Sequence, residues 1–524
     1  MNSEKGLALS TAGSRVVLAY GLVSAALYCG LMPIWEGFDE LFHYGYVQSV
    51  AYEGRFPEVG NAALSVELWR SLDFAPVSGN IQHDLERPST TFTNYFEFSE
   101  SKRKELRQGL DGIARESQRV PSPRQNYEAK QAPLTYLLLA PFEWALSSAP
   151  LPLRVMVLRM ILALTSVTLT WFGMFRLGRR LELPAAMTSA IVFILFSCQM
   201  TYGAVCHVAN DALLGPWLLI YLAALIDAWE MPSLKHTATS AGLMAVGLLL
   251  KSSLIAFVPF VFVWKWRRAP LQLAAQAGIL LTLAGPWYVR NLLLYQNLTA
   301  TPETGGIGMA TLTKTATVIP WGDSILRTMH EVLWKGNNSF TTFSEATLNV
   351  ALALFGISLA MYAARRRRIA RELIVLAAML LYCAALTMIT LSFFVSTKGA
   401  ITAPMPWYTQ ILLGPLLAIC FLGLSRWERW GRRLAAVQIV LWAYIGLIGW
   451  LAKLVPQYGG FQTGRAHLVE LSAWYFKEAP ARNSILSTLC PAPIWMIYSL
   501  LAAVAILTVA MAVRLLNGLR PAAG

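Results

Sequence analysis

Long apolar segments recur along most of this chain, and charged residues are largely confined to the stretches between them. Only 14% of the residues are charged and 56% are hydrophobic, whereas a soluble domain carries roughly 25% charged residues. A run of about 20 apolar residues can cross a bilayer as a helix, which satisfies its own backbone hydrogen bonds in hydrocarbon. The sequence therefore predicts an all-α integral membrane protein, with residues 1–524 forming a single polytopic domain.

About twelve segments are predicted to be transmembrane helices, which places both termini on the same side of the membrane. A further apolar segment, residues 134–146, is too short and too closely bounded by prolines for a crossing. We expect it to form a re-entrant or interfacial helix. The predicted crossings cover residues 16–34, 155–175, 185–203, 212–228, 237–250, 254–264, 271–286, 346–364, 373–395, 411–424, 434–455 and 494–516.

The distribution of charge predicts how the chain is oriented. The formal net charge is +14, yet residues 35–130 hold 15 of the 29 acidic residues and only 11 of the 43 basic ones. Most other basic residues lie in short loops on the side of the termini, which the positive-inside rule assigns to the cytoplasm. We therefore predict a large, partly helical exterior loop at 35–130 and further exterior loops at 287–345 and 456–490. This topology accounts for the positive charge without a nucleic-acid partner.

Residues 33–44, where the first predicted crossing ends, are unusually rich in ionisable groups. Glu36, Asp39, Glu40 and His43 lie within eight residues. If a short helix follows the crossing, Asp39 and His43 lie one turn apart on one face, and Glu36 joins them. A carboxylate there can deprotonate a hydroxyl or amine nucleophile, and a neighbouring acid or imidazole can orient it. The alternative is a polar helix end at the membrane interface. So many carboxylates are costly near lipid, which favours the functional interpretation.

The Asp39-Glu40 pair at the exterior end of the first helix, with His43 just after it, resembles the GT-C superfamily of membrane glycosyltransferases. This superfamily includes the protein O-mannosyltransferases and the lipid A aminoarabinose transferases. The resemblance implies that a sugar moves from a polyprenyl-phosphate-linked donor to a glycan, lipid or protein acceptor at the non-cytoplasmic face. It also implies a bacterial inner membrane, an active site facing the periplasm, and Asp39 as the catalytic base.

Further segments resemble the same superfamily. Residues 126–136, with the sequence Asn-Tyr-Glu-Ala-Lys-Gln-Ala-Pro-Leu-Thr-Tyr, place Lys130 where those enzymes have a lysine that meets the donor phosphate. Asp211 matches an acidic position in the second exterior loop, Lys251 a lysine at a tight exterior turn, and Arg290 the arginine of a Trp-Tyr-x-x-Arg-Asn stretch. The chain departs from the pattern at Pro406-Trp407-Tyr408, where many relatives have Arg-Tyr. The resemblance thus implies catalytic roles for Asp39, Glu40, His43 and Asp211, and donor phosphate binding by Lys130, Lys251 and Arg290.

Each of these residues also has a simpler structural interpretation. Asp211 can cap the helix that begins at residue 212, and lysines at the ends of spans can extend into the interface without any further role. Arg290 follows a Trp-Tyr pair and can serve only to fix the helix at the interface. We interpret Arg154 and Arg159 in the same way, as snorkelling side chains, and His207 as structural.

The need for a metal ion stays open at this point. Some GT-C enzymes use a divalent cation and others do not, and Asp39 with Asp211 could ligate one through oxygen. The six cysteines are scattered and contain no C-x-x-C pair, so we predict neither a disulfide framework nor a cysteine-type zinc site.

We therefore predict a glycosyltransferase of the GT-C type that uses a lipid-phosphate-linked sugar. The first alternative is a transporter of a lipid-linked or anionic solute, which would place its charges in the middle of the membrane. The chain shows no internal repeat, which weakens a transporter built from two related halves. The second alternative is a non-catalytic scaffold whose large exterior loop binds a partner.

Overall fold

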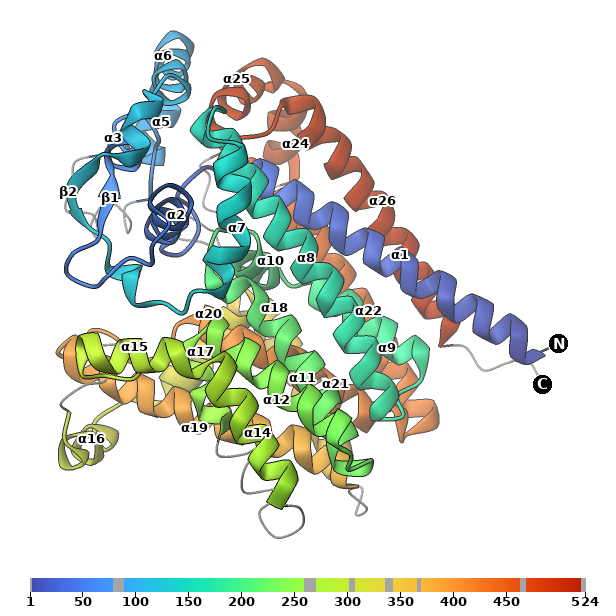
Figure 1. Ribbon diagram of the computed structural model, residues 1–524. Coiled ribbons are helices and arrows are strands. Elements are labelled where there is room, and N and C mark those ends of the chain that lie inside the picture. The colour runs from blue at the N-terminus through green and yellow to red at the C-terminus, as the bar shows by residue number, and fades with distance from the viewer. Residues whose placement is uncertain are drawn as a thin grey trace.

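The protein is a bundle of helices with a small, mixed exterior region at one end, as the computed structural model shows (Figure 1). The structure describes residues 2–78, 89–258, 270–300, 307–334, 343–364, 369–461 and 468–519. In these residues, helices predominate, and two short strands form one small antiparallel sheet. The predicted all-α membrane architecture is confirmed.

The bundle is built from helices whose apolar composition explains their length and burial. The two longest, α1 and α8, pack against each other, and α8 also packs against α11. The bundle helices are α1 (Asn2–Leu31), α8 (Leu151–Arg180), α9 (Ala185–Ser197), α10 (Gln199–Val205), α11 (Leu214–Glu230), α12 (Leu234–Leu250), α14 (Pro270–Leu283), α15 (Gly285–Tyr295), α18 (Glu345–Ala363), α19 (Ala370–Ser396), α21 (Leu413–Ser425), α22 (Glu428–Ile448) and α26 (Ile494–Gly518).

Eight helical segments among the described residues are long and apolar enough to cross a membrane. The number rises to ten if two bent pairs are each one span: α9 with α10, bent by 70°, and α14 with α15, bent by 57°. The sequence predicted about twelve. One difference is α12, which has 17 residues and is therefore short for a crossing. The other is the predicted crossing at 254–264, most of which lies outside the described residues.

The exterior region follows α1 and is tied together by a two-stranded sheet. Strand β1 (Ala63–Ser65) pairs antiparallel with β2 (Pro121–Gln125), with Ala63 opposite Gln125 and Ser65 opposite Pro121. Within the predicted exterior loop, α6 ends at Asp111 with Gly112 as its C-cap, and a 3₁₀ helix, η2, follows at Arg115. The helical elements here are α2 (Glu40–Gln48), η1 (Ser49–Glu53), α3 (Val66–Ser71), α5 (Phe92–Glu97), α6 (Glu100–Asp111), η2 (Arg115–Arg119), η3 (Tyr127–Lys130) and α7 (Leu134–Ala145).

Helix α7 agrees with the expectation of a short apolar helix that does not span the membrane. It has 12 residues, and its apolar side chains Leu137, Leu138, Phe142 and Trp144 are exposed on one side. The remaining short elements connect the bundle helices. They are η4 (Asn210–Leu213), η5 (Ser252–Phe257), α16 (Met309–Ala316), α17 (Trp321–Leu333), α20 (Pro406–Thr409), η7 (Gln410–Leu412), η8 (Gly449–Leu454), α23 (Val455–Tyr458), α24 (Leu468–Phe476) and α25 (Ala479–Leu489).

The two ends of the bundle differ in what they contain. The start of α1 and the end of α26 lie together at one end, whereas α2, α3, α5 and α6 lie at the other (Figure 1). Near the termini, the Trp171 indole on α8 donates to the Ser14 carbonyl on α1. At the same end, Arg371 on α19 bonds to Glu182 and Glu230, which gathers α8, α11 and α19. The acidic exterior region and the basic helix ends are thus on opposite sides of the bundle.

Candidate functional site

Asp39 is the N-cap residue of α2 and follows the turns that come after the end of α1. Its φ of 54° is in the left-handed region, which Asp tolerates better than most residues. The His43 amide donates to the Asp39 carbonyl over 3.1 Å, so the two residues lie one turn apart as predicted. The Asp39 side chain is half-buried, and the Tyr127 hydroxyl donates to its Oδ1 over 2.5 Å. Asp39 therefore presents a carboxylate whose orientation is fixed by a residue 88 positions away.

Glu36 does not join this face, which corrects the expectation from the sequence. It precedes α2 in a buried turn, where the Tyr458 hydroxyl donates to its Oε2 over 3.3 Å. The helix begins only at residue 40 because Pro33 to Asp39 form turns rather than a continuous helix. The spacing of Glu36 from Asp39 therefore does not correspond to helical geometry.

Glu40 is buried and bound on both oxygens, so its carboxylate is committed to the protein. Arg159 of α8 donates from Nε to Oε1 over 2.6 Å and from Nη2 to Oε2. The backbone amides of Trp35 and Val208 also donate to it, over 3.2 and 3.0 Å. Burial alone would raise the pKa of Glu40, but the Arg159 guanidinium outweighs burial and lowers it. Glu40 is thus ionised and suited to hold the start of α2 in place.

His43 is buried and neutral at physiological pH. Burial lowers its pKa to about 3. Its Nδ1 lies 2.7 Å from the Tyr136 hydroxyl of α7 and 4.0 Å from Oε2 of Glu128 on η3. Glu128 is also buried, and burial raises its pKa. His43 therefore connects α2 with the segment that carries Tyr127 and Lys130, as an uncharged hydrogen-bonding group.

Asp211 and Lys251 form a buried ion pair. The Lys251 ammonium contacts Oδ1 of Asp211 and lies 4.2 Å from the centre of the Tyr408 ring. Asp211 lies inside the 3₁₀ turn η4 rather than at its N-cap, which is Ala209, so the capping interpretation was wrong. The adjacent Asn210 amide donates to Gln131 over 2.9 Å and to the Leu250 carbonyl over 3.2 Å. These bonds join the turn before α11 to η3 and to the end of α12.

Lys130 and Arg290 occupy different surroundings. Lys130 ends η3, three residues after Tyr127; it is half-buried, and its charge acts on the neighbouring Glu128. Arg290 on α15 donates to the Pro57 carbonyl over 3.2 Å, and its guanidinium lies 4.9 Å from the Trp287 ring and 5.9 Å from the Tyr295 ring. Lys130 therefore lies on the same short helix as Tyr127, which contacts Asp39, whereas Arg290 contacts the loop after η1.

Arg154 and Arg159 do not snorkel, which is a further correction. Both side chains are 0% exposed. Arg154 pairs with Glu67 of α3 and with Glu143 of α7, and the Tyr44 hydroxyl donates to Glu143 over 2.5 Å. Buried arginines with carboxylate partners connect α8 to the exterior region. The sequence places both arginines near the membrane boundary, but it does not indicate their carboxylate partners.

Aromatic side chains for which no role was predicted also surround Asp39. Phe42 of α2 lies 4.2 Å from the Tyr127 ring, and Phe38 lies 4.3 Å from the Trp407 ring of α20. Tyr127 lies in the segment 126–136, which resembles the superfamily at Lys130. Its position three residues before that lysine is the only feature of the sequence that indicated a role for Tyr127. Buried His207 lies 5.9 Å from Phe38. This ring contact agrees with a structural role for His207.

The site therefore gathers residues from five separate segments: 38–43, 126–136, 207–211, 251 and 407–408. It combines a half-buried carboxylate, a tyrosine hydroxyl that donates to it, a lysine on the same 3₁₀ helix as that tyrosine, and a neutral histidine. Within the described ranges, no group of three or more His, Cys, Asp and Glu side chains is placed to hold a metal ion. Asp211 is engaged by Lys251 and Asp39 by Tyr127, so a metal between these two carboxylates would have to compete with both contacts.

The solved structures that this chain resembles include two states of one protein. No family model matches the sequence, and no curated protein matches it. The fold is similar to that of ArnT from Cupriavidus metallidurans bound to undecaprenyl phosphate, with a TM-score of 0.47 and 14% identity, over 98% of this chain and 76% of that chain. For the apo state of the same protein, the TM-score is 0.39 and the identity 14%, over 87% of this chain and 74% of that one.

Proposed function

We propose that this protein is a membrane glycosyltransferase that moves a sugar from a polyprenyl-phosphate donor to an acceptor hydroxyl or amine at the membrane surface. The observation that carries the proposal is the setting of Asp39. Its carboxylate is half-buried at the end of the first span, Tyr127 donates to it, and Lys130 ends the same short turn. A base beside a cation is what displacement at a phosphate-bearing carbon needs. The motif resemblance to the GT-C superfamily supports the same reaction.

Asp39 is the proposed base. It takes the proton from the acceptor as the acceptor oxygen or nitrogen attacks the anomeric carbon. The bond between that carbon and the phosphate oxygen breaks, and the polyprenyl phosphate leaves with the electron pair. Negative charge grows on the phosphate, so a cation held nearby lowers the barrier. Lys130 is the proposed cation, and Glu40 and His43 hold α2 so that Asp39 faces the substrate.

The roles of Lys251, Asp211 and Arg290 differ within this proposal. Lys251 would have to leave Asp211 to reach a phosphate, because the two groups are already in contact. We propose that the pair first positions η4 and η5, and that Lys251 turns to the donor when it binds. Arg290 lies beside the loop after η1, where it would meet a part of the donor or acceptor away from Asp39.

The side of the membrane belongs to the proposal as well. The exterior region holds the excess of acidic residues, and the basic helix ends lie at the opposite end of the bundle. By the positive-inside rule, this supports a site facing the periplasm of a bacterial inner membrane. A transporter would instead need ionisable groups in the middle of the spans, and the groups of this site lie at the ends of helices.

Replacement of Asp39 by Asn tests the proposal. The change keeps the shape of the side chain but removes the proton acceptor, so transfer should fall by about 10²- to 10⁴-fold. Binding of the donor lipid and stability in detergent should remain close to wild type. The assay compares sugar transfer from a panel of polyprenyl-phosphate-linked sugars and donor binding for the purified variants.

Asp111→Asn is the matched control. Asp111 ends α6 in the same exterior region, is exposed, and pairs with Arg107 on its own helix. We expect full transfer from this variant. Full transfer by a well-folded Asp39→Asn variant would rule out the proposed base and would leave the transporter or the scaffold as the better explanation.

A further inference from the structure

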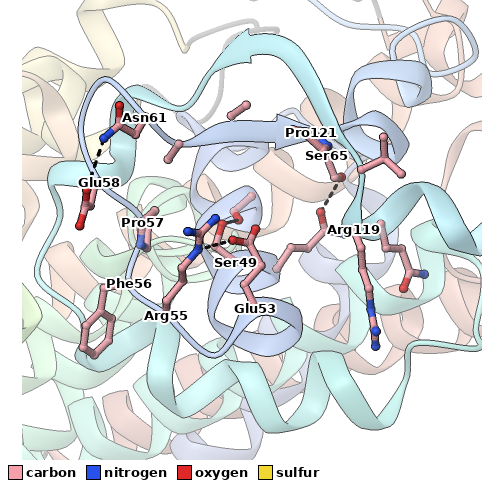
Figure 2. Close-up of a pocket in the computed structure, with 16 residues that line it drawn as sticks. Ser49, Glu53, Arg55, Phe56, Pro57, Glu58, Asn61, Ser65, Arg119 and Pro121 are labelled. Carbon is pink, nitrogen blue, oxygen red and sulfur yellow. Dashed lines mark hydrogen bonds and ion pairs between the residues drawn. The ribbon is translucent and has the colours of Figure 1, made fainter.

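A hollow opens in the exterior region, away from Asp39. It encloses about 510 Å³ and lies between the chain from α2 to β1 and the turn that joins η2 to β2 (Figure 2). Ligand pockets commonly measure about 300–1,000 Å³. Asp39, Lys130 and Lys251 are not among the residues that line it. The hollow is therefore large enough for a ligand and distinct from the candidate catalytic site.

The floor of this pocket is polar and held in place by its own hydrogen bonds. Ser65 donates to the Gln48 side-chain carbonyl over 2.7 Å, and the Gln48 amide donates to Glu67 over 2.7 Å. Glu67 in turn pairs with the buried Arg154. The floor is thus fixed to α8 through a buried ion pair, and a ligand would meet a surface that is already formed.

The rim carries side chains that both donate and accept hydrogen bonds. Glu58, Asn61 and Arg119 are exposed around the opening, and the Asn61 amide donates to Glu58 over 3.4 Å (Figure 2). Arg55 pairs with Glu53 over 2.6 Å beside them. Two carboxylates and two guanidinium groups cancel in formal charge. The pocket therefore offers no net attraction to an anion.

This chemistry selects one class of ligand. Most small-molecule pockets are lined mainly by apolar side chains, and a lipid chain would need such a lining. Amides, carboxylates and guanidinium groups, by contrast, match hydroxyl groups that both donate and accept hydrogen bonds. A neutral saccharide presents many such hydroxyls and no charge. It fits both the polar lining and the balanced charge of the rim.

Two elements lead from the pocket to Asp39. Helix α2 begins beside Asp39 and ends at Gln48 in the pocket; its nine residues span about 13 Å. Strand β2 begins at Pro121 in the pocket wall and leads into η3, where Tyr127 donates to Asp39. A chain of several sugar units bound in the pocket could thus extend toward the proposed base.

We propose that this pocket binds the neutral saccharide part of the acceptor. The assignment to an acceptor rests on the proposed transferase function, whereas saccharide binding itself does not. The test uses the full-length protein in lipid nanodiscs, labelled with a fluorophore and applied to a printed array of neutral, anionic and zwitterionic glycans. Asn61→Ala and Arg119→Ala remove exposed rim groups, whose side chains contact Glu58 and the Tyr52 ring, respectively. Arg115→Ala, on the same 3₁₀ turn as Arg119, is the control.

The wild type and Arg115→Ala should retain a common set of neutral saccharides. Loss of one hydrogen bond should weaken this binding about two- to tenfold in Asn61→Ala, and about tenfold or more in Arg119→Ala, where the donor is charged. Asp39→Asn should bind the same saccharides as wild type. Equal binding by all variants, retention of no saccharide, or retention of anionic glycans alone would overturn the pocket assignment.

The two proposals fail in different ways. Full transfer by Asp39→Asn together with weakened binding in the rim variants would remove the transferase and keep the saccharide site. Loss of transfer in Asp39→Asn, with unchanged saccharide binding and transfer in the rim variants, would do the reverse.

Discussion

Ion pairs occur at both ends of the bundle, but they differ in burial. The pairs that join α8 to the exterior region have both partners buried, whereas the pairs at the opposite end keep their arginine partly exposed. Arg154 and Arg159 and their partners Glu143 and Glu40 have 0% of their side chains exposed. At the opposite end, Arg371 is 25% exposed, and its partner Glu182 is 70% exposed. Buried pairs hold a fixed geometry because water cannot replace either partner. Exposed pairs contribute little to stability.

The difference shows where the protein needs rigidity. Both buried arginines lie near the start of α8, and their partners lie on α2, α3 and α7. These contacts fix α2, and therefore Asp39, relative to the bundle. The exposed basic residues near the termini need no fixed partner, because a positive charge on the cytoplasmic side is sufficient to orient the spans in a membrane.

The largest expected effect comes from breaking a buried pair. Arg159→Met leaves Glu40 buried without its cation, which should lower the free energy of unfolding by about 3–5 kcal/mol. Thermal unfolding in detergent measures this effect. The double variant Glu40→Leu/Arg159→Leu should recover much of the loss, because replacement of both partners by apolar residues is often neutral. Wild-type stability of Arg159→Met would abolish the proposed contrast between the two ends.

The next largest effect is expected for Lys130, which we propose contacts the donor phosphate. Lys130→Met should reduce transfer about ten- to a hundredfold, since a charge-assisted hydrogen bond contributes about 1.5–3 kcal/mol. Lys104→Met, on the exposed face of α6, is the control and should transfer normally. Lys251→Met should reduce stability as well as transfer, because it leaves Asp211 buried without a partner. Normal turnover by Lys130→Met would remove Lys130 from the phosphate site.

A smaller effect depends on pH. Burial holds the pKa of His43 at about 3, against about 6.5 in an unfolded chain. Between these values, the unfolded chain binds a proton that the folded protein does not. The free energy of unfolding should therefore fall by about 1.4 kcal/mol for each pH unit below 6.5, and this contribution should be constant above that pH. Burial also lowers the pKa of His207, so His43→Gln should reduce the slope rather than abolish it.

The measurement is unfolding of wild type and His43→Gln at pH 7 and pH 5. His236→Gln, at the start of α12 near the basic end, is the matched control and should keep the wild-type slope. An unchanged slope in His43→Gln would show that the imidazole is hydrated.

The smallest effect is expected at the basic end. Arg371→Met removes contacts to Glu182 and Glu230, yet it should change the free energy of unfolding by no more than about 1 kcal/mol, since these pairs are partly solvated. The same thermal assay used for Arg159→Met gives the comparison directly. A loss as large as that of Arg159→Met would mean that both ends are equally rigid.

The sequence predicted features that depend on local pattern. Hydropathy predicted the helical membrane fold, and the spacing of Asp39 and His43 predicted the turn that begins α2. It did not predict the partners of Arg154 and Arg159, because Glu67 and Glu40 lie 87 and 119 residues away and no local pattern links them. The saccharide pocket was missed for the same reason, since Ser65 and Arg119 meet only when the sheet forms. The predicted number of crossings exceeds the eight to ten candidates because α12, with 17 residues, is short for a crossing, and most of the predicted crossing at 254–264 lies outside the described residues.

The order of the ion pairs along the chain has a consequence for biogenesis. Glu40, Glu67 and Glu143 all precede the two arginines of α8 that they neutralise. When α8 enters the membrane during synthesis, every acidic partner has already left the ribosome. The exterior region can therefore fold first and receive both cations as α8 arrives. A truncation that removes residues 35–130 would leave Arg154 and Arg159 without Glu40 and Glu67 at the moment of insertion, so the defect would appear as failed assembly before any step of catalysis.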